Sequence, residues 1–229
     1  MQQGSEEWRQ ARLGCVTASR VADVIARTKT DWGASRKNYA AELIVERLTG
    51  VPTEGYTNAA MQFGLDNEAQ ARAAYSFCYD ADVIEVGFIP HPTIPISGCS
   101  PDGLIGTDGL VEIKVPNSAT HIETLLGSEI PDKYIVQMQF QMACTGAKWA
   151  DFVSFDPRMP ARLSLYVKRI QRDDKRIAEL EALVKDFLAE LDAKLAALNA
   201  LGNSTKEPAV TSKSPPLHHA DLQTTAPIF

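Results

Sequence analysis

Apolar residues recur in two alternating patterns along this chain of 229 residues. Segments with helical spacing of three and four residues are interspersed with short β-favouring runs. This order predicts an α/β protein (α+β in type) whose mixed sheet is flanked by helices. We expect a helix starting near Thr17, further helices over 7–13, 39–48, 59–79, 132–145 and 173–201, and strands over 83–89, 104–105, 110–115, 149–155 and 163–170.

A tight hairpin is predicted between residues 104 and 115. The glycines and the aspartate of Gly106-Thr107-Asp108-Gly109 suit a turn between two apolar runs. Side chains alternate faces along the second strand, so Glu112 and Lys114 share one face. We expect this charged pair to face a cleft and the apolar set on the other face to pack on the core: Val111, Ile113 and Val115.

Two carboxylates meet at this hairpin. Asp102 precedes the first strand, and the turn returns the chain so that Glu112 lies near it. Carboxylates hold hard cations such as Mg²⁺, which activate water and neutralise charge in phosphodiester hydrolysis. Lys114 can orient the water or stabilise the developing charge. The hairpin is therefore a candidate Mg²⁺-dependent nuclease site, and the alternative is a solvated hairpin with an exposed Glu/Lys pair.

A candidate phosphate pocket lies nearer the N-terminus. Arg12 precedes Thr17 and Ser19, which fall at a predicted helix start where free backbone N–H groups favour an anion. The alternative is a capped surface helix. A loop-like basic stretch follows, which either meets a DNA backbone or faces water; its residues are Arg27, Lys29, Arg36 and Lys37.

Composition and charge narrow the function classes. A net charge of −6 and a pI of about 5.3 argue against a protein that coats nucleic acid nonspecifically, but they allow a local basic channel. No apolar run approaches the roughly 20 residues that span a membrane, and the N-terminus is polar, so we expect a cytoplasmic protein without a membrane partner. The four cysteines are too widely spaced to predict a zinc cluster or a disulfide framework.

The domain organisation is predicted to be simple. With 45% hydrophobic residues the chain can bury one α/β core, which we place in a single domain over residues 1–201. From residue 202 onward, a Ser/Thr/Pro/Lys mixture without apolar periodicity predicts a disordered tail over 202–229.

Several short motifs follow one another along the chain, and their order is characteristic of a known family. They are Arg12 to Ser19, Gly64 to Glu68, Ser100 to Leu104, Glu112 to Pro116, Gln137 to Gln139 and Asp156 to Met159. On these motifs the sequence resembles the phage λ exonuclease (YqaJ-like viral recombinase) family of PD-(D/E)xK nucleases. The resemblance runs from about Trp8 to Arg158. It implies a restriction-endonuclease-like PD-(D/E)xK core.

The resemblance also implies an activity. Family members are Mg²⁺-dependent, processive 5′→3′ exonucleases on linear double-stranded DNA, and Mn²⁺ is expected as a substitute ion. They release 5′-mononucleotides from 5′-phosphorylated ends and leave a 3′ single strand for phage-type recombination. The resemblance further implies a ring-shaped homotrimer, a single-strand annealing protein as partner, and the cytoplasm of a bacterial host of a phage or prophage as the place of action.

Roles for individual residues are carried over by motif. Asp102 and Glu112 match the metal ligands, Lys114 the catalytic lysine, and Glu68 the helix-borne acid that assists the metal site. Met61 is placed as the apolar wedge at the terminal base pair, and Lys29 as a contact to DNA ahead of the cut. The positions that bind the 5′-terminal phosphate are matched by Arg12, Ser19, Ser100 and Gln137.

Two other classes of function remain open. A related PD-(D/E)xK endonuclease or RecB-like repair nuclease would cut closed circles or prefer single strands. A degenerate nuclease fold that serves as an inactive DNA-binding module is the less favoured alternative, because Asp102, Glu112 and Lys114 are all present. Between one and two metal ions, the sequence allows either arrangement.

Overall fold

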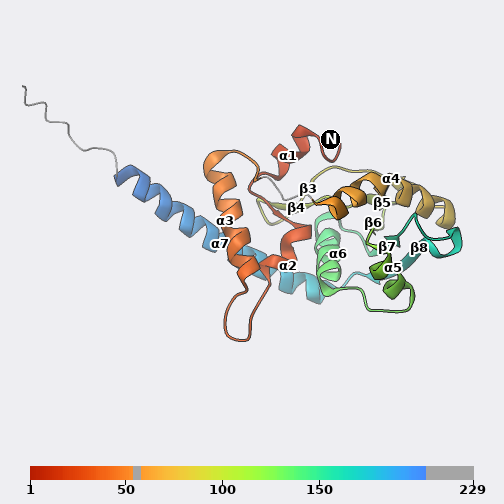
Figure 1. Ribbon diagram of the computed structural model, residues 1–229. Helices are drawn as coiled ribbons and strands as arrows, with labels where there is room; N and C mark the ends of the chain where they lie inside the picture. Colours follow the sequence, from red (N-terminus) through yellow and green to blue (C-terminus); the bar gives the residue numbers. More distant parts are fainter. Residues whose placement is uncertain (54–57, 205–229) are drawn as a thin grey trace, which may run out of the picture.

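The computed structural model describes residues 1–53 and 58–204 and is built around a mixed five-stranded sheet (Figure 1). Its strand order is β2-β5-β6-β7-β8, in which β6 and β7 are parallel and the other neighbours are antiparallel. The predicted mixed-sheet α/β class is confirmed. The strands are β2 (Val83–Ile84), β5 (Gly103–Ile105), β6 (Gly109–Lys114), β7 (Trp149–Phe155) and β8 (Leu165–Gln171).

A smaller three-stranded sheet lies beside the first, in the order β1-β4-β3. Its strands are β1 (Val16–Thr17), β4 (Ser97–Cys99) and β3 (Ile89–Pro90). The pairing of β1 with β4 is parallel, with Val16 opposite Ser97. This sheet brings the Arg12 to Ser19 motif alongside the chain that enters Ser100, although more than 80 residues separate the two motifs in the sequence.

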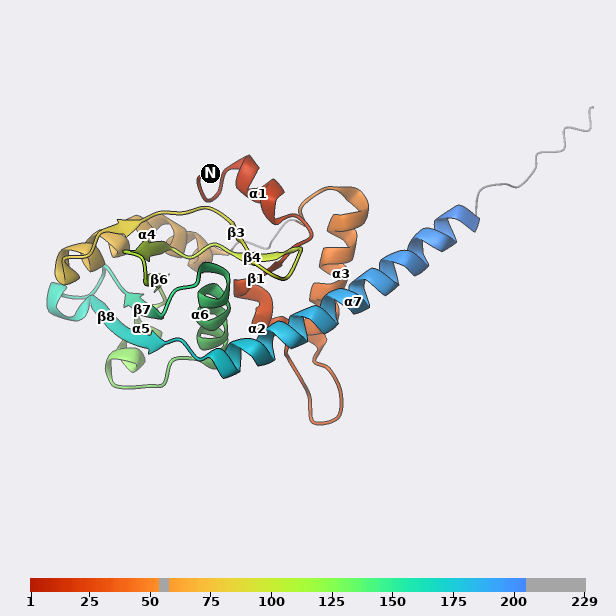
Figure 2. The ribbon, with the colours of Figure 1, turned by 180° about the vertical axis from the view of Figure 1, so that it is seen from behind.

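Helices surround the two sheets (Figures 1 and 2). The longest, α7, runs along the molecule and extends beyond its body, and Leu191 is the last buried residue among those whose burial is described, which end at residue 201. The α-helices are α1 (Glu6–Arg12), α2 (Val21–Val24), α3 (Ala34–Thr49), α4 (Ala59–Tyr79), α5 (Ser118–Leu125), α6 (Asp132–Thr145) and α7 (Asp174–Ser204). Two short 3-10 helices, η1 (Ala18–Arg20) and η2 (Ala161–Leu163), complete the set described.

The two faces of β6 pack against different helices, as its period-two pattern predicts. Val111 and Ile113 belong to an apolar cluster with Ala71 and Tyr75 of α4. Leu110, on the opposite face, belongs to a cluster with residues of α6 such as Met138 and Met142. The face that carries Glu112 is therefore covered by α6, and the carboxylate lies beneath a helix rather than on the open cleft that we expected.

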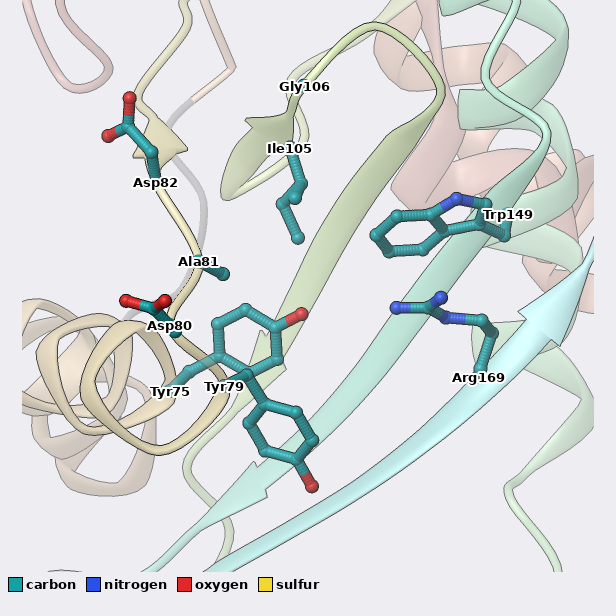
Figure 3. A pocket seen from close by; sticks show the side chains of 9 residues that line it. All are labelled: Tyr75, Tyr79, Asp80, Ala81, Asp82, Ile105, Gly106, Trp149 and Arg169. Carbon is teal, nitrogen blue, oxygen red and sulfur yellow. The ribbon is translucent and has the colours of Figure 1, made fainter.

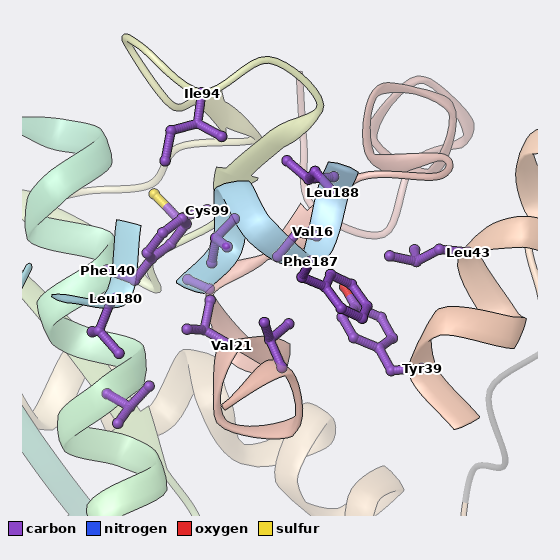
Figure 4. Close-up of a cluster of buried hydrophobic side chains, with 14 of the residues drawn as sticks. Val16, Val21, Tyr39, Leu43, Ile94, Cys99, Phe140, Leu180, Phe187 and Leu188 are labelled. Atoms are coloured by element: carbon purple, nitrogen blue, oxygen red, sulfur yellow. The ribbon is translucent and has the colours of Figure 1, made fainter. Parts of the chain in front are cut away.

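A third apolar cluster joins the small sheet to the helices (Figure 4). Val16, Val21 and Cys99 are fully buried here and meet Phe140 of α6 and Phe187 of α7. Tyr39 of α3 stacks on Phe187, with ring centroids 5.9 Å apart. Burial of this size stabilises a helix that is too short to be stable alone, which explains why the single turn of α2 persists.

One predicted strand is wrong. Residues 83–89 form two short strands in different sheets, because β2 pairs with β5 whereas β3 pairs with β4. The chain divides at Gly87, where a Cβ atom would lie 2.5 Å from the carbonyl oxygen of Met1. Gln3 also donates from Nε2 to the carbonyl of Val86, at 2.9 Å. The N-terminal segment therefore occupies the space that a continuous strand pairing would need.

Two predictions near the N-terminus also need correction. The helix expected near Thr17 is a 3-10 turn followed by the four residues of α2, and Thr17 makes no side-chain capping bond. The helix expected over 39–48 begins earlier, at Ala34, so Arg36 and Lys37 are helical. Arg36 is 3% exposed, donates to the Val24 carbonyl and pairs with Glu190, which excludes it from a DNA-binding loop.

Other features were missed or lie outside the description. Neither β4 nor α5 was predicted; α5 begins after Asn117, whose side chain accepts from the Thr120 N–H at 2.9 Å. Helix α7 continues through Ser204, so the first three residues of the predicted tail are helical, and residues 205–229 lie outside the described residues. Among the described helices, none is both long and apolar enough to cross a bilayer.

Candidate active site

The hairpin of β5 and β6 brings Asp102, Glu112 and Lys114 together. Asp102 precedes β5, and its Oδ2 accepts from the Ile113 backbone N–H at 2.6 Å, which ties this carboxylate to the middle of β6. Lys114 Nζ is paired with Glu112 Oε1. The ammonium also lies 5.0 Å from the ring centre of Tyr134 on α6. The three residues that the motif singled out therefore form one cluster.

Glu112 is almost fully buried and is held by amides of α6. Its side chain is 2% exposed. Gln137 Nε2 donates to Oε1 and Gln141 Nε2 donates to Oε2, each at 2.6 Å. Because the two glutamines are four residues apart, they lie on the same face of α6 and reach the same carboxylate. These donors stabilise a buried charge that would otherwise be costly.

Glu68 approaches the cluster from α4. Its Oε1 accepts from Arg72 Nη2 at 2.7 Å, and Arg72 Nε donates to the carbonyl of Asp102 at 3.2 Å. Arg72 also pairs with Glu85 at 2.6 Å. Arg72 thus links the helix-borne acid to the start of the hairpin and places Glu68 within electrostatic reach of Asp102.

Burial and neighbouring acids together shift the pKa values of the cluster. Burial raises the pKa of Asp102 well above its ordinary value, and the negative charge of Glu112 raises it further, while Lys114 opposes the shift. Burial alone would lower the pKa of Lys114, but the charges of Glu112 and Asp102 outweigh burial and raise that pKa. The cluster therefore has more negative charge than its own cations neutralise, which favours an added cation.

These residues fit a Mg²⁺ ion held by few protein ligands. Within residues 1–53 and 58–204, no three His, Cys, Asp or Glu side chains surround a common point as a closed metal cage would require. Mg²⁺ is usually held by one or two carboxylates together with waters and substrate phosphate oxygens, so an open pair is the expected form. Asp102 and Glu112, which the hairpin brings together, would supply such a pair.

A cavity of about 480 Å³ is lined by two of the four predicted phosphate-binding residues, Arg12 and Ser19, whereas Ser100 does not line it. Met61 lines it as well. The Arg12 guanidinium stacks on the ring of Trp8 at 3.8 Å, and Trp8 Nε1 donates to Ser100 Oγ at 2.9 Å. This chain of contacts leads from the arginine of the cavity to a serine only two residues before Asp102.

Tyr39 and Glu46 of α3 hold the loop that forms the cavity wall. Tyr39 Oη accepts from the Thr17 N–H and donates to the Cys15 carbonyl, both at 3.2 Å. Burial raises the pKa of Tyr39 to about 12, so the hydroxyl keeps its proton as a donor. Glu46 accepts from the Gly14 N–H at 2.8 Å, and Gly14 has a φ of +66°, which favours glycine. The cavity wall is thus fixed by buried bonds.

Of the other predicted site residues, Met61 lines the cavity, whereas Gln137 and Lys29 do not. Gln137 is not among the cavity-lining residues; in this structure it donates to Glu112 instead. Met61 is 55% exposed at the start of α4, on the cavity wall. Lys29 is exposed in the loop between α2 and α3, which projects away from the two sheets and does not line the cavity (Figure 2).

A second cavity, of about 410 Å³, lies at the opposite end of the sheet (Figure 3). It is lined by aromatic rings of Tyr79 and Trp149 and by Arg169, whose guanidinium stacks on Trp149 at 3.5 Å. None of the predicted site residues lines it. This cavity therefore belongs to a different part of the molecule from the carboxylate cluster.

Three functional contacts escaped sequence reasoning: those made by Trp8, Arg72 and Gln141. Each is four residues from a predicted site residue on the same helix, because Trp8 precedes Arg12, Arg72 follows Glu68 and Gln141 follows Gln137. This spacing places the pairs on one helical face. This spacing is the signal in the sequence that could have identified them.

Fold and site together define a class of protein. A mixed sheet whose central hairpin carries paired carboxylates and a lysine, beside an arginine-lined cavity, suits a nuclease. The sequence profile of the YqaJ-like viral recombinase domain matches residues 7–148. The chain belongs to this family, and the resemblance seen in its motifs is confirmed.

Solved structures agree with the family. The alkaline exonuclease LHK-Exo from Laribacter hongkongensis is 53% identical, with a TM-score of 0.81 and coverage of 87% of this chain and 99% of that one. LHK-Exo in complex with dAMP gives 52% identity and a TM-score of 0.82 over the same shares. A phage-related exonuclease from Haemophilus somnus, at 16% identity and a TM-score of 0.62 over 80% of this chain and 96% of its own, is similar in fold alone. No curated protein sequence matches. The chain is thus a homologue of a phage-type exonuclease.

Proposed function

We propose that this chain is a Mg²⁺-dependent exonuclease that degrades one strand of linear double-stranded DNA in the 5′→3′ direction from a 5′-phosphorylated end. It releases 5′-mononucleotides and leaves a 3′ single strand for recombination by strand annealing. The observation that carries the proposal is the link from Arg12 through Trp8 to Ser100, two residues before Asp102. A phosphate anchor joined so closely to a hydrolytic site suits cleavage at a strand end.

The chemistry is divided among the residues of the cluster. A divalent cation between Asp102 and Glu112 would supply Lewis-acid activation and charge neutralisation. Lys114 donates a hydrogen bond toward the attacking water or the phosphoryl oxygen and stabilises charge there. Glu68, positioned by Arg72, adds an acceptor for the water on the α4 side. The side chains of Arg12, Ser19 and Ser100 hold the terminal phosphate, which fixes the position of the next phosphodiester bond.

Such an anchor accounts for direction and processivity. Each hydrolysis leaves a new 5′-phosphate on the shortened strand, and the same arginine attracts it back into the cavity. The dAMP complex of LHK-Exo supports a deoxynucleoside monophosphate as the product class. A homotrimeric ring, a single-strand annealing protein as partner, Mn²⁺ as a substitute ion and action inside a bacterial host belong to the same proposal.

Degradation of a linear duplex labelled separately at each end tests the proposal. Reactions contain Mg²⁺ or EDTA and compare 5′-phosphate with 5′-hydroxyl ends, with Lys114→Ala as the inactive reference. We expect Mg²⁺-dependent release of mononucleotides from phosphorylated 5′ ends, and none from Lys114→Ala. Cutting of a closed circle would instead identify an endonuclease, and a lack of cleavage by the wild type would identify a binding module.

Arg12→Ala provides the sharper test of the phosphate cavity. A charge-assisted hydrogen bond contributes about 1.5–3 kcal/mol, so we expect the preference for 5′-phosphate over 5′-hydroxyl ends to fall by about 10- to 100-fold. The matched control is Arg27→Ala. Arg27 also stacks on a tryptophan, Trp32, at 3.7 Å, but it does not line the cavity. An unchanged end preference in Arg12→Ala would show that the cavity assignment is wrong.

A further inference from the structure

Gln141 is fully buried beneath the catalytic hairpin, and nothing in the proposed chemistry uses it. Its relative exposure is 0%. It lies one turn after Gln137 on α6 and donates from Nε2 to Glu112 Oε2 at 2.6 Å. A carboxylate only accepts hydrogen bonds, so this contact fixes which end of the Gln141 amide faces Glu112.

The two oxygens of Glu112 have different partners. Oε1 is shared between Gln137 and Lys114, and Lys114 is the side chain that the proposed function directs toward the attacking water or the phosphoryl oxygen. Oε2 accepts from Gln141, which is too deeply buried to contact DNA. If Lys114 turns toward substrate, the Gln141 bond still holds Oε2 of the carboxylate.

The carbonyl oxygen of the Gln141 side chain forms no stabilising hydrogen bond with the described residues. This atom, Oε1, is buried without a hydrogen-bond partner among the residues that the structure describes. A buried carbonyl oxygen left unpaired destabilises a protein, so an apolar side chain would be favoured here if packing alone mattered. The N–H that reaches Glu112 is the feature that distinguishes glutamine from such a residue.

We propose that Gln141 is a positioning residue that fixes the orientation of Glu112 and thereby sets the affinity of the site for a divalent cation. The inference rests on the proposed function, because Glu112 is a metal ligand only within it. Groups that orient metal ligands are typically worth about 10- to 100-fold in metal affinity or activity when they are removed. Gln141 acts through Glu112 and touches neither substrate nor the reacting atoms.

Gln139 is a matched control on the same helix. It is 3% exposed, and its amide bonds at both ends: Nε2 donates to the Gln171 carbonyl at 2.8 Å and Oε1 accepts from the Asp173 N–H at 2.9 Å. These partners belong to the connection between β8 and α7, away from the carboxylates. Replacement of Gln139 therefore tests the structural cost of removing a buried glutamine without disturbing Glu112.

The experiment compares Gln141→Met and Gln139→Met in the full-length protein. Binding of Mn²⁺ is measured by electron paramagnetic resonance of the free ion, with and without a duplex whose terminal linkages are non-hydrolysable. Half-saturating Mg²⁺ in cleavage and the KM for duplex ends are measured in parallel. Thermal unfolding in metal-free buffer reports the structural effect, and Gln141→Asn, whose shorter amide cannot reach Oε2, serves if Gln141→Met does not fold.

We expect Gln141→Met to weaken Mn²⁺ binding and to raise half-saturating Mg²⁺ by about 10- to 100-fold, with the KM for duplex ends unchanged. Gln139→Met is expected to lower thermal stability and to leave both metal readouts at wild-type values. Equal metal binding by Gln141→Met and the wild type, or equal weakening in both variants, would overturn the inference. Failure of the wild type to cleave DNA with Mg²⁺ would instead overturn the proposed function.

Discussion

Adjacent parallel strands of the central sheet each carry a buried carboxylate, and the two have opposite surroundings. Asp151 on β7 is paired in register with Val111, one residue before Glu112 on β6. Arg169 donates to both oxygens of Asp151, at 2.8 and 2.9 Å, and Tyr75 Oη donates to Oδ2 at 2.6 Å. Glu112 receives two neutral amides and one lysine, and further acids, Asp102 and Glu68, lie close by.

The difference separates a structural ion pair from a site prepared for a ligand. At Asp151 one guanidinium neutralises one carboxylate, and this guanidinium, from Arg169, stacks on Trp149 in the second cavity (Figure 3). Burial and then the hydrogen bond with Asp151 raise the pKa of Tyr75, so its hydroxyl stays a donor. At Glu112 the carboxylates outnumber the cations that touch them. Burial of an acidic residue is therefore no guide to function; the balance of charge around it is.

Glu112→Gln gives the largest effect that the comparison predicts. The amide has the same size but cannot serve as an anionic metal ligand, so we expect Mg²⁺-dependent cleavage to fall by about 10³-fold or more, because the metal contributes several kcal/mol to transition-state stabilisation. Cooperative thermal unfolding should persist. Asp108→Asn, in the turn of the same hairpin, is the control, since Asp108 pairs with exposed Lys148 and should be dispensable for cleavage. Retained activity in Glu112→Gln would contradict the assignment of this strand.

Arg169→Met should do the reverse of Glu112→Gln: it should lower stability and leave cleavage unchanged. Loss of Arg169 leaves the Asp151 charge buried, with Tyr75 as its remaining donor, so we expect a loss of about 1–2 kcal/mol in the free energy of unfolding, less than for a fully buried pair because Arg169 is half exposed. Cleavage per folded molecule should stay at the wild-type level. Urea unfolding measures the first quantity, and Lys168→Met on the same strand, where the residue is exposed, is the control. A large loss of activity at wild-type stability would show that the two ends of the sheet are functionally linked.

The sequence predicted the features of the site that depend on local pattern. The turn residues and the period-two pattern located the β5–β6 hairpin, and the order of motifs located Asp102, Glu112 and Lys114. Contacts between distant segments could not be predicted from local pattern. The Trp8 to Ser100 hydrogen bond joins residues 92 positions apart, and the break between β2 and β3 depends on Met1 and Gln3 packing against Gly87 and Val86.

The burial of Glu112 beneath α6 could not be predicted from the sequence either. Its pairing with α6 depends on how that helix crosses the sheet, and a face containing a Glu/Lys pair reads in the sequence as open to solvent. The amide donors of Gln137 and Gln141 are what make burial of the charge tolerable. The sequence therefore predicted that Asp102, Glu112 and Lys114 lie together, but it did not predict that α6 covers them.

Asp156 tests whether the role of a buried acid depends on the charges around it or on its position in the sheet. It follows β7, at the same end of the sheet as Lys114, and its side chain is 0% exposed. Burial would raise its pKa, but hydrogen bonds from Arg158 outweigh burial and lower the pKa to about 2. Arg158 also donates to the Pro116 carbonyl at 3.1 Å. By its balanced charge, Asp156 resembles Asp151 rather than Glu112, so its role should be structural.

The pH dependence of Asp156→Asn follows from the sign of this shift. A carboxyl group whose pKa is lower in the folded state stabilises the fold above its unfolded pKa, near 4, and loses that contribution as the pH falls through about 2. We expect Asp156→Asn to lose about 1–2 kcal/mol at pH 7, reduced from the full shift because Arg158 is half exposed. The deficit measured by urea unfolding should shrink between pH 4 and pH 3, and Mg²⁺-dependent cleavage at pH 8 should match the wild type. A deficit independent of pH would trace the loss to the geometry of the loop rather than to the charge.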